Sequence, residues 1–316
     1  MIGRTCVTGL RQILVFLIAR IVVFMKTFLV TGASGYLGHS IVNNLATSPY
    51  TRVIAILGRP EDYAFSLFKR DNVIVCPCSS LFSVDFGPID VLIHTAFSRG
   101  ENLSGLANSI HLTESIINLV NTRDIRSLIN ISSQGVYKTL EKGETVAEDG
   151  LLEPGTAYGL AKLCVEKMIS LGCTKKFSNI RMASLARNAR FLDFFVSQVL
   201  SGKSLSITTP NRYASIMDVS DAVTGILSVA GIDESSRLTT YNLGPGRQRS
   251  ILDYANLVNK VAQDFGFHPV PISIEDSGIN TAICMDCSRL KGQTKWDCQI
   301  DDEMMIRKLF ENKLNV

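Results

Sequence analysis

The sequence lacks a strong excess of charge of either sign, because 32 Lys and Arg residues stand against 29 Asp and Glu residues. These charges are scattered along the chain, so the basic patch of a nucleic-acid-binding protein is not indicated. There is one tryptophan, and the 23 glycines follow no period, which excludes collagen, repeat arrays and low-complexity sequence. With 46% hydrophobic residues over 316 positions, the chain can bury a full core as one large domain or two smaller ones.

Metal-binding patterns are also scarce. Cys284 and Cys287 form a CxxC pair, but no second pair accompanies them, and the whole chain has four histidines. A chain of this length does not depend on disulfides, so we interpret the eight cysteines as reduced thiols in a cytoplasmic protein. We predict no metal site.

No apolar run reaches the roughly 20 uninterrupted residues that a membrane-spanning helix requires. The longest candidate, Ile13–Met25, is interrupted by Arg20, and no small-x-small cleavage site follows it. We expect residues 1–25 to be an apolar extension outside the fold, with Met25 as the true start and no stable membrane span. An amphipathic anchor or an early export signal is the alternative.

Short apolar runs alternate with helical patterns from Thr27 onward. This alternation is typical of βαβ units, in which helices cover both faces of a parallel sheet. The expected strands are Phe28–Thr31, Arg52–Leu57, Val73–Cys76, Val91–His94, Leu128–Ser132 and Ile180–Met182, and the expected helices are Tyr36–Ala46 and Leu106–Asn121. We therefore predict the α/β fold class, with a doubly wound parallel sheet.

The pattern loosens after Met182. Four further elements are expected there: an amphipathic stretch over Phe191–Leu200, a strand over Ser204–Thr208, and helices over Val219–Ala230 and Leu252–Phe265. A Pro/Gly turn at residues 244–246 introduces the last helix. We expect a second, smaller domain that shares elements with the first.

A glycine-rich loop follows the first expected strand and opens the first expected helix. It reads Thr31-Gly32-Ala33-Ser34-Gly35-Tyr36-Leu37-Gly38, with GxxGxxG spacing. In this position one glycine allows a tight turn, one allows close approach to a pyrophosphate, and one allows the helix to pack on the strand. The loop predicts a dinucleotide site, with a ligand-free glycine turn as the alternative.

An acid that would bind the ribose of NAD is missing from the end of the second expected strand. No Asp or Glu occurs before Glu61, and the strand is followed by Leu57-Gly58-Arg59. Arg59 can pair with a 2′-phosphate, which favours NADP modestly, although a solvated loop arginine fits the sequence equally well.

Tyr158 and Lys162 form a YxxxK pair at the start of a helical stretch. Residues four apart share a helix face, so the ammonium can approach the phenol and favour its phenolate. Such a tyrosine can donate and accept a proton in alcohol and ketone chemistry. Ser133 lies at the end of the expected strand Leu128–Ser132. Open α/β sheets bind ligands at such strand ends, so the Ser133 hydroxyl can hold the substrate oxygen.

These motifs together resemble the extended short-chain dehydrogenases/reductases of the NAD-dependent epimerase/dehydratase family. Further similarities are His94-Thr95-Ala96 at the family's HxAA, residues 131–137 at SSxxVYG, Ile180-Arg181-Met182 at LR(Y/L), Met217-Asp218-Val219 at VDD(V/L), and Asp286-Cys287-Ser288-Arg289 with Trp296 at DxSKxxxxLGW. The resemblance implies a Rossmann domain over residues 26–183 and a smaller, mainly substrate-binding domain over 184–316, with 213–230 returning to the first. A homodimer is also expected.

The resemblance implies particular site residues. Tyr158 would be the acid/base, Lys162 would hold the nicotinamide ribose and tune Tyr158, and Ser133 would bind the reacting hydroxyl. The remaining NAD(P)-binding residues would be Gly32, Ser34, Gly35, Tyr36, Leu37, Gly38, Arg59 and Ala96. Ser184 occupies the position of a substrate-contacting Asn, and Arg99 and Arg187 are candidates to face an anionic substrate such as a pyrophosphate, or else are solvated.

Two enzyme hypotheses follow. One is epimerisation of a nucleotide sugar, in which hydride leaves the sugar and returns to the other face. The other is NADPH-dependent reduction of a keto-sugar or other small ketone. Ser133-Gln134-Gly135 replaces the Thr-Asp-Glu of 4,6-dehydratases, which argues against dehydration. A non-catalytic dinucleotide sensor is a third, weaker hypothesis.

Overall fold

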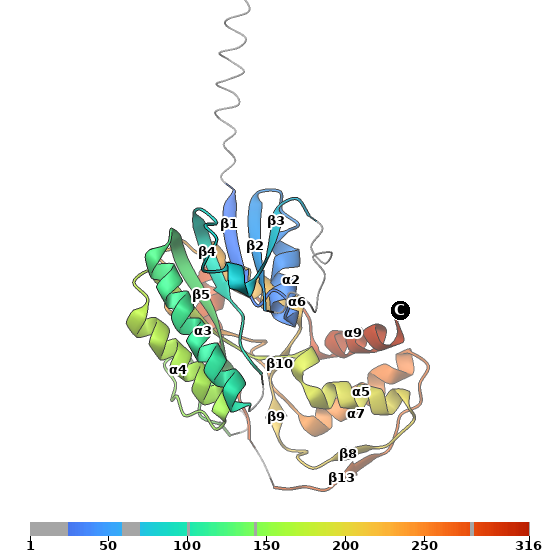
Figure 1. Cartoon of the computed structure of the whole chain (residues 1–316). Coiled ribbons are helices and arrows are strands. Elements are labelled where there is room, and N and C mark those ends of the chain that lie inside the picture. The colour runs from blue at the N-terminus through green and yellow to red at the C-terminus, as the bar shows by residue number, and fades with distance from the viewer. Residues whose placement is uncertain (1–24, 59–69, 100–101, 142–143, 279–280, 316) are drawn as a thin grey trace, which may run out of the picture.

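The computed structural model describes residues 25–58, 70–99, 102–141, 144–278 and 281–315. Its central sheet is parallel, with strand order β11-β6-β5-β4-β1-β2-β3 (Figure 1). The strands are β1 (Lys26–Thr31), β2 (Thr51–Leu57), β3 (Val73–Pro77), β4 (Ile89–His94), β5 (Ile125–Ser133), β6 (Lys176–Met182) and β11 (Thr240–Leu243). The predicted α/β class and doubly wound parallel sheet are confirmed.

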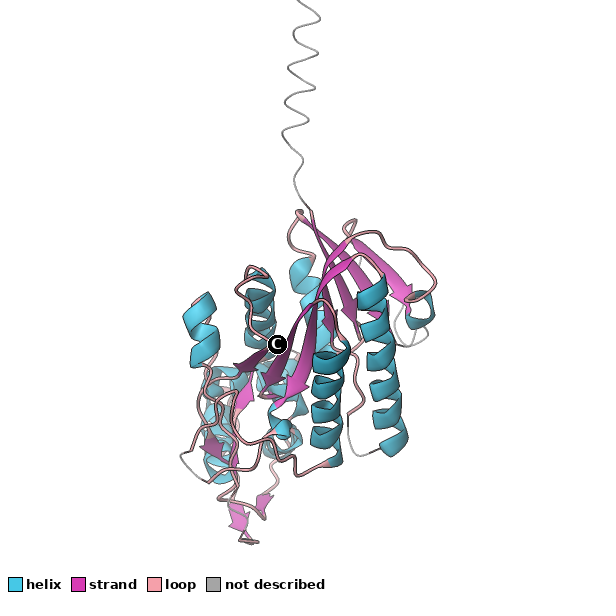
Figure 2. Cartoon of the chain, turned by 90° about the vertical axis from the view of Figure 1, so that its left-hand side faces the viewer, coloured by secondary structure: helices cyan, strands magenta, loops and turns pink. Residues whose placement is uncertain are grey.

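Helices cover both faces of this sheet (Figure 2). Helices α2 (Tyr36–Leu45) and α6 (Val219–Gly231) pack on one face, and α3 (Leu103–Thr122) and α4 (Ala157–Gly172) pack on the other. Sequence analysis missed β11, which contains four residues and lies at the sheet edge beside β6. So short a strand carries little periodic signal, and its pairing with β6 joins segments some 60 residues apart.

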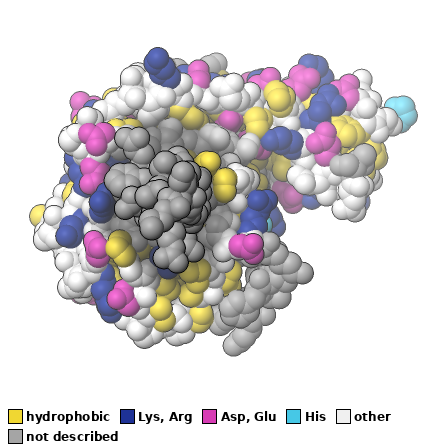
Figure 3. Space-filling view, turned by 90° about the horizontal axis from the view of Figure 1, so that it is seen from above, with side chains coloured by type: hydrophobic (Ala, Val, Ile, Leu, Met, Phe, Trp, Pro, Cys, Tyr) yellow, Lys and Arg dark blue, Asp and Glu magenta, His cyan; other side chains and the backbone are white. Residues whose placement is uncertain are grey.

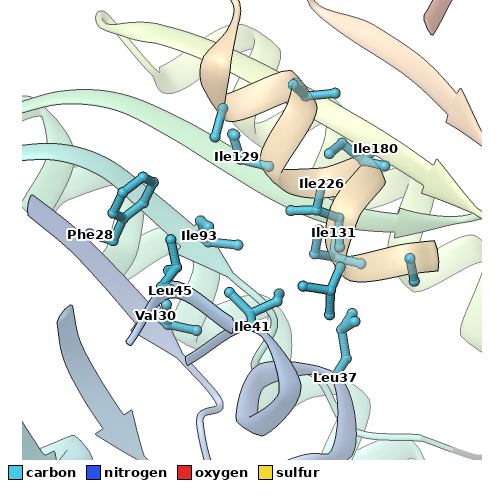
Figure 4. Packing of buried hydrophobic residues seen from close by; sticks show 14 of the residues in the cluster. Phe28, Val30, Leu37, Ile41, Leu45, Ile93, Ile129, Ile131, Ile180 and Ile226 are labelled. Carbon is cyan, nitrogen blue, oxygen red and sulfur yellow. The ribbon is translucent and has the colours of Figure 1, made fainter. Parts of the chain in front are cut away.

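Successive side chains of a strand point to opposite faces of the sheet, so strand β1 contributes side chains to two hydrophobic clusters. Phe28 and Val30 of β1 belong to the hydrophobic cluster that contains Ile41 of α2 and Ile226 of α6 (Figure 4). Leu29, between them, belongs instead to the cluster beneath α3 and α4. Because both faces are covered, the strand reads as a continuous apolar run.

The carboxy-terminal part forms a separate hydrophobic cluster beside the sheet, at the lower right of Figure 1. It is built mainly by α5 (Arg190–Leu200), α7 (Ile251–Asp264) and α9 (Asp302–Leu314), with the parallel pair β8 (Leu205–Ile207) and β13 (Ile272–Ile274). Its other short elements are β7 (Ser184–Leu185), β9 (Tyr213–Ala214), β10 (Ile216–Met217), β12 (Arg249–Ser250) and α8 (Ser288–Thr294). Through β11, α6 and α8 the chain returns to the first core.

The face seen from above carries cationic and anionic side chains interspersed with one another (Figure 3). Residues 1–24, expected to be an apolar extension, lie outside the described residues. Among the helices that are described, none has both the length and the apolar character needed to cross a membrane.

Candidate active site

The glycine loop links β1 to α2 and needs its glycines. Gly32 has φ of +71°, and a Cβ there would lie 2.8 Å from the Ala96 backbone. A Cβ on Gly38 would lie 2.3 Å from the Gly32 carbonyl oxygen, so the helix can approach the turn this closely only without a side chain. These glycines therefore allow the loop to lie against Ala96, which follows β4, and allow α2 to begin close to the turn.

A cavity of about 370 Å³ opens over this loop and is lined by Gly32, Gly35, Tyr36, Leu37, Gly38, Thr95, Phe97, Arg99, Ile131, Ser132, Tyr158, Lys162 and Met182. Gly35 caps α2 without any side-chain hydrogen bond, and the first turn of α2 contains no acidic residue. The first backbone N–H groups of a helix lack intrahelical partners and suit an anion such as a pyrophosphate. The residues present therefore fit a dinucleotide.

The residue that follows β2, Gly58, contacts the glycine loop. Gly58 donates its backbone N–H to the Ser34 Oγ, 3.4 Å away, so Ser34 ties the loop to β2. Arg59, the candidate for a 2′-phosphate, lies outside the described residues.

Tyr158 lies in the first turn of α4, and the local sequence explains its placement. The Thr156 Oγ accepts a hydrogen bond from the Gly159 N–H at 3.0 Å and so caps the helix. A Cβ on Gly159 would lie 2.2 Å from the Gly135 carbonyl oxygen, so this glycine lets α4 approach the turn that follows β5. The approach brings Tyr158 and Ser133 to one cavity.

This second cavity has a volume of about 400 Å³ and is lined by Arg99, Ser132, Ser133, Tyr158, Met182, Ala183, Ser184, Leu185, Arg187, Asn188 and Arg190. Tyr158 lines both this cavity and the one over the glycine loop. The Ser133 Oγ accepts a hydrogen bond from the Gly135 N–H at 3.1 Å, which holds its hydroxyl at the strand end. The structure thus brings Ser133, Tyr158 and Lys162 together around adjoining cavities.

Lys162 is buried and lies one helical turn after Tyr158 in α4. Its Nζ donates to the Ile131 carbonyl oxygen at 2.7 Å and lies 3.7 Å from the centroid of the Phe97 ring and 5.9 Å from that of Tyr158. Burial, reinforced by the positive charge of Arg99, lowers the pKa of Lys162 to about 7, against the opposing effect of Glu166.

The lowered pKa of Lys162 predicts a pH-dependent stability. Between pH 7 and 10.5 the unfolded chain keeps a proton that the folded protein releases, so the free energy of unfolding rises with pH. The stability gained from releasing this proton is therefore lost progressively as the pH falls from 10.5 to about 7. We expect the wild-type protein to gain stability relative to Lys162→Met between pH 7 and pH 9.5 in urea unfolding. Lys167→Met, at an exposed position of α4, is the control; a difference independent of pH would contradict the assignment.

Two opposing effects act on the pKa of Tyr158. Burial raises the pKa of its phenol, and the Arg99 guanidinium opposes this shift. A nearby cation does favour the phenolate, but desolvation of the phenolate outweighs that effect. The cation that acts on this phenol is Arg99, which sequence spacing did not place beside it.

A buried ion pair between Arg181 and Glu166 connects the elements that carry the site residues. Arg181 of β6 donates its Nη2–H to Glu166 Oε2 at 2.8 Å and its Nη1–H to the Tyr137 hydroxyl at 2.9 Å. Glu166 of α4 also accepts a hydrogen bond from the Ser132 hydroxyl. This network joins β5, β6 and α4, which carry Ser133, Tyr158 and Lys162. Sequence analysis missed Glu166, although it lies four residues after Lys162 on the same face of the helix.

Among the substrate candidates, Ser184 accepts a hydrogen bond from Gln134 Nε2 at 3.2 Å, and the Arg187 guanidinium lies 5.0 Å from the centroid of the Tyr36 ring. A third cavity, of about 450 Å³, adjoins the second and shares Ser184, Asn188 and Arg190 with it. Its lining adds Arg212. Sequence analysis did not single out Arg190, the first residue of α5, or Arg212, which precedes β9, since isolated arginines form no pattern.

Carboxylates are absent from the described residues that line these three cavities. Likewise, the described part of the chain holds no group of three or more His, Cys, Asp or Glu residues placed to bind a metal ion. The site is therefore cationic where the described chain borders it.

Comparisons with known proteins agree with this geometry. A model of the NAD dependent epimerase/dehydratase family matches residues 28–244. An uncharacterized membrane protein of Methanocaldococcus jannaschii is 24% identical over 268 residues, covering 80% of this chain and 77% of that protein. A UDP-glucuronic acid 4-epimerase from Bacillus cereus, in complex with UDP-glucuronic acid and NAD, superposes with a TM-score of 0.76 at 19% identity, covering 92% of this chain and all of that one. The UDP-glucose 4-epimerase of Thermotoga maritima, with UDP-glucose, gives 0.75 at 17% identity, with the same coverage.

Proposed function

The chain belongs to the NAD dependent epimerase/dehydratase family, within the extended short-chain dehydrogenases/reductases, and we propose that it epimerises a hydroxyl-bearing carbon of a nucleotide sugar. The observation that carries this proposal is the position of Tyr158, which lines both the glycine-loop cavity and the adjoining cavity that contains Ser133. A substrate hydroxyl bound there would lie between a proton acceptor and the cofactor site.

In the proposed reaction Tyr158 takes the proton of the substrate hydroxyl while Ser133 holds the oxygen. A nicotinamide held over residues 32–38 would supply the redox chemistry, which is reversible hydride transfer at the carbon that bears this hydroxyl. Tyr158 then gives the proton back to the oxygen, so no net oxidation occurs. Lys162 holds the nicotinamide ribose, and residues 32–38 with Ala96 form the remaining dinucleotide site.

The substrate is proposed to occupy the cavities bordered by Ser184, Arg187, Arg190 and Arg212. Arginine guanidinium groups suit a diphosphate because they donate two parallel hydrogen bonds. In this proposal residues 26–183 bind the cofactor and residues 184–316 mainly bind the substrate. Dehydration is not proposed, since Gln134 and Gly135 offer no acid/base pair and Gln134 instead donates to Ser184.

A second candidate is NADPH-dependent reduction of a keto-sugar or other ketone. It is favoured by the lack of any Asp or Glu before Glu61 and by Arg59 after β2. In that reaction Tyr158 would donate a proton to the carbonyl oxygen, and the cofactor would leave after each turnover.

Cofactor content separates the two functions. We expect the full chain, purified without added nucleotide and then denatured, to release NAD(H) at a near-stoichiometric level, because an epimerase regenerates its cofactor in place. The released dinucleotide is identified by chromatography, and NADH and NADPH affinities are measured on the same preparation. Protein that is empty and binds NADPH much more tightly than NADH would favour the reductase.

A further inference from the structure

His94 is a buried histidine that ends β4 and is not among the residues that line the three cavities. Its Nδ1 lies 2.7 Å from the Thr31 hydroxyl oxygen, at the end of β1, and its Nε2 lies 3.1 Å from the Thr113 hydroxyl oxygen, in α3. All three side chains are at most 2% exposed, so water does not compete for these hydrogen bonds. The imidazole therefore connects β1, β4 and α3 beside the start of the glycine loop.

The hydrogen-bond partners of His94 decide which ring nitrogen carries the proton. Burial, reinforced by the positive charge of Lys162, lowers the pKa of His94 to about 3, so the ring is neutral near pH 7. The Thr113 hydroxyl donates its single proton to the Ser109 carbonyl oxygen, 2.8 Å away. The Thr113 oxygen can then only accept from the imidazole, which places the ring proton on Nε2. Nδ1 keeps a lone pair, and the Thr31 hydroxyl donates to it.

The same threonine is held through its backbone by the residue that follows His94. The Thr31 carbonyl oxygen accepts the Thr95 hydroxyl at 2.7 Å and the Thr95 N–H at 3.3 Å. Thr95 lines the glycine-loop cavity, and its hydroxyl oxygen lies 2.8 Å from the place where a Cβ on Gly32 or on Gly38 would be. The residue from which the loop departs is thus fixed at both its side chain and its carbonyl group.

This attachment bears on the cofactor because the proposed dinucleotide site consists largely of backbone N–H groups of the loop. Donors that are already held in place lose less conformational entropy on binding, so the ligand binds more tightly. Thr31 and Gly32 share a peptide unit, and any freedom of Thr31 therefore passes directly into the loop. The hydrogen bond between Thr31 and His94 should matter for cofactor affinity as well as for stability.

We infer that His94 is a positioning residue for the dinucleotide: in its Nε2-protonated form it accepts the Thr31 hydroxyl and so holds the glycine loop in the shape that binds the pyrophosphate. This inference rests on the proposed function, since it presupposes the dinucleotide site. His94 acts through Thr31 and does not itself contact the cofactor.

Thr31→Val tests the hydrogen bond, because valine has nearly the shape of threonine and lacks the donor. We expect the Kd for NAD, measured by calorimetry on the full chain after bound nucleotide has been dialysed out, to rise about 3- to 10-fold, the effect of one lost hydrogen bond. Thr51→Val is the matched control. The Thr51 hydroxyl donates to the Leu45 carbonyl oxygen at 2.6 Å, at the opposite end of the β1–β2 pair. This control should also lower the free energy of unfolding in urea, but it should leave the Kd for NAD unchanged.

Two substitutions of His94 itself extend the test. His94→Phe removes both ring nitrogens and should weaken NAD binding at least as much as Thr31→Val. His94→Asn keeps an acceptor near the position of Nδ1 and should restore most of the affinity. A merely structural role would lower stability in both variants without this recovery of NAD binding.

Nitrogen-15 NMR of histidine-labelled wild-type protein reads the protonated ring nitrogen directly. The chain has four histidines, and the His94 signals are those missing from His94→Asn. We expect the proton on Nε2. A proton on Nδ1, or a Kd for NAD that is the same in Thr31→Val and Thr51→Val, would overturn the inference while the proposed function stands. A wild-type protein that binds neither NAD nor NADPH would overturn both.

Discussion

Replacing Tyr158 by phenylalanine is expected to lower kcat by about 10²- to 10⁴-fold, the contribution of one positioned proton donor and acceptor. The variant loses only the hydroxyl. Its ring can keep the edge-to-face contact with Phe97, whose centroid lies 5.8 Å away, so the cavity should retain its shape. We therefore expect the dinucleotide affinity to change little. Turnover is measured with a nucleotide sugar, and affinity by calorimetry with NAD.

Tyr50→Phe is a suitable control, since Tyr50 is 59% exposed in the loop before β2 and lines none of the three cavities. It should leave both quantities unchanged. Full turnover in Tyr158→Phe would refute the proposed acid/base. A parallel loss of cofactor binding would instead indicate that the phenol has a structural role.

The second large effect concerns stability. Arg181→Met is expected to lower the free energy of unfolding by about 3–5 kcal/mol, because it leaves the Glu166 carboxylate buried without its cation. Arg181 and Glu166 are 5% and 4% exposed, so water cannot replace the lost guanidinium without opening the structure. Urea unfolding of the wild-type protein and the variant measures the difference.

A double variant separates the ion pair from simple packing. In Arg181→Met with Glu166→Gln, the uncompensated charge is gone, and we expect much of the lost stability to return. Equal losses in the single and double variants would show that the shape of Arg181, and not its charge, stabilises the network. Because Ser132 and α4 belong to this network, the single variant should also lose activity.

Local patterns in the sequence were sufficient for the architecture around the cofactor site. Apolar runs of strand length between helical stretches predicted six strands of the central sheet, each of which appears with its ends extended by a few residues or unchanged. The glycine spacing after the first strand predicted a turn that the φ of +71° at Gly32 confirms. These features depend on neighbouring residues, so their signals lie within short windows.

Sequence alone therefore determined the α/β class, the glycine turn and the helical spacing of Tyr158 and Lys162, all of which are set by backbone geometry over a few residues. Only the tertiary structure placed β11 in the sheet and joined Glu166 to Arg181. It also brought Arg99, Tyr158 and Arg190 to one cavity, with Arg212 in the adjoining one. It also decided that burial raises the pKa of the phenol. These outcomes depend on which distant segments pack together and on how far water is excluded between them, and neither quantity is encoded in local spacing.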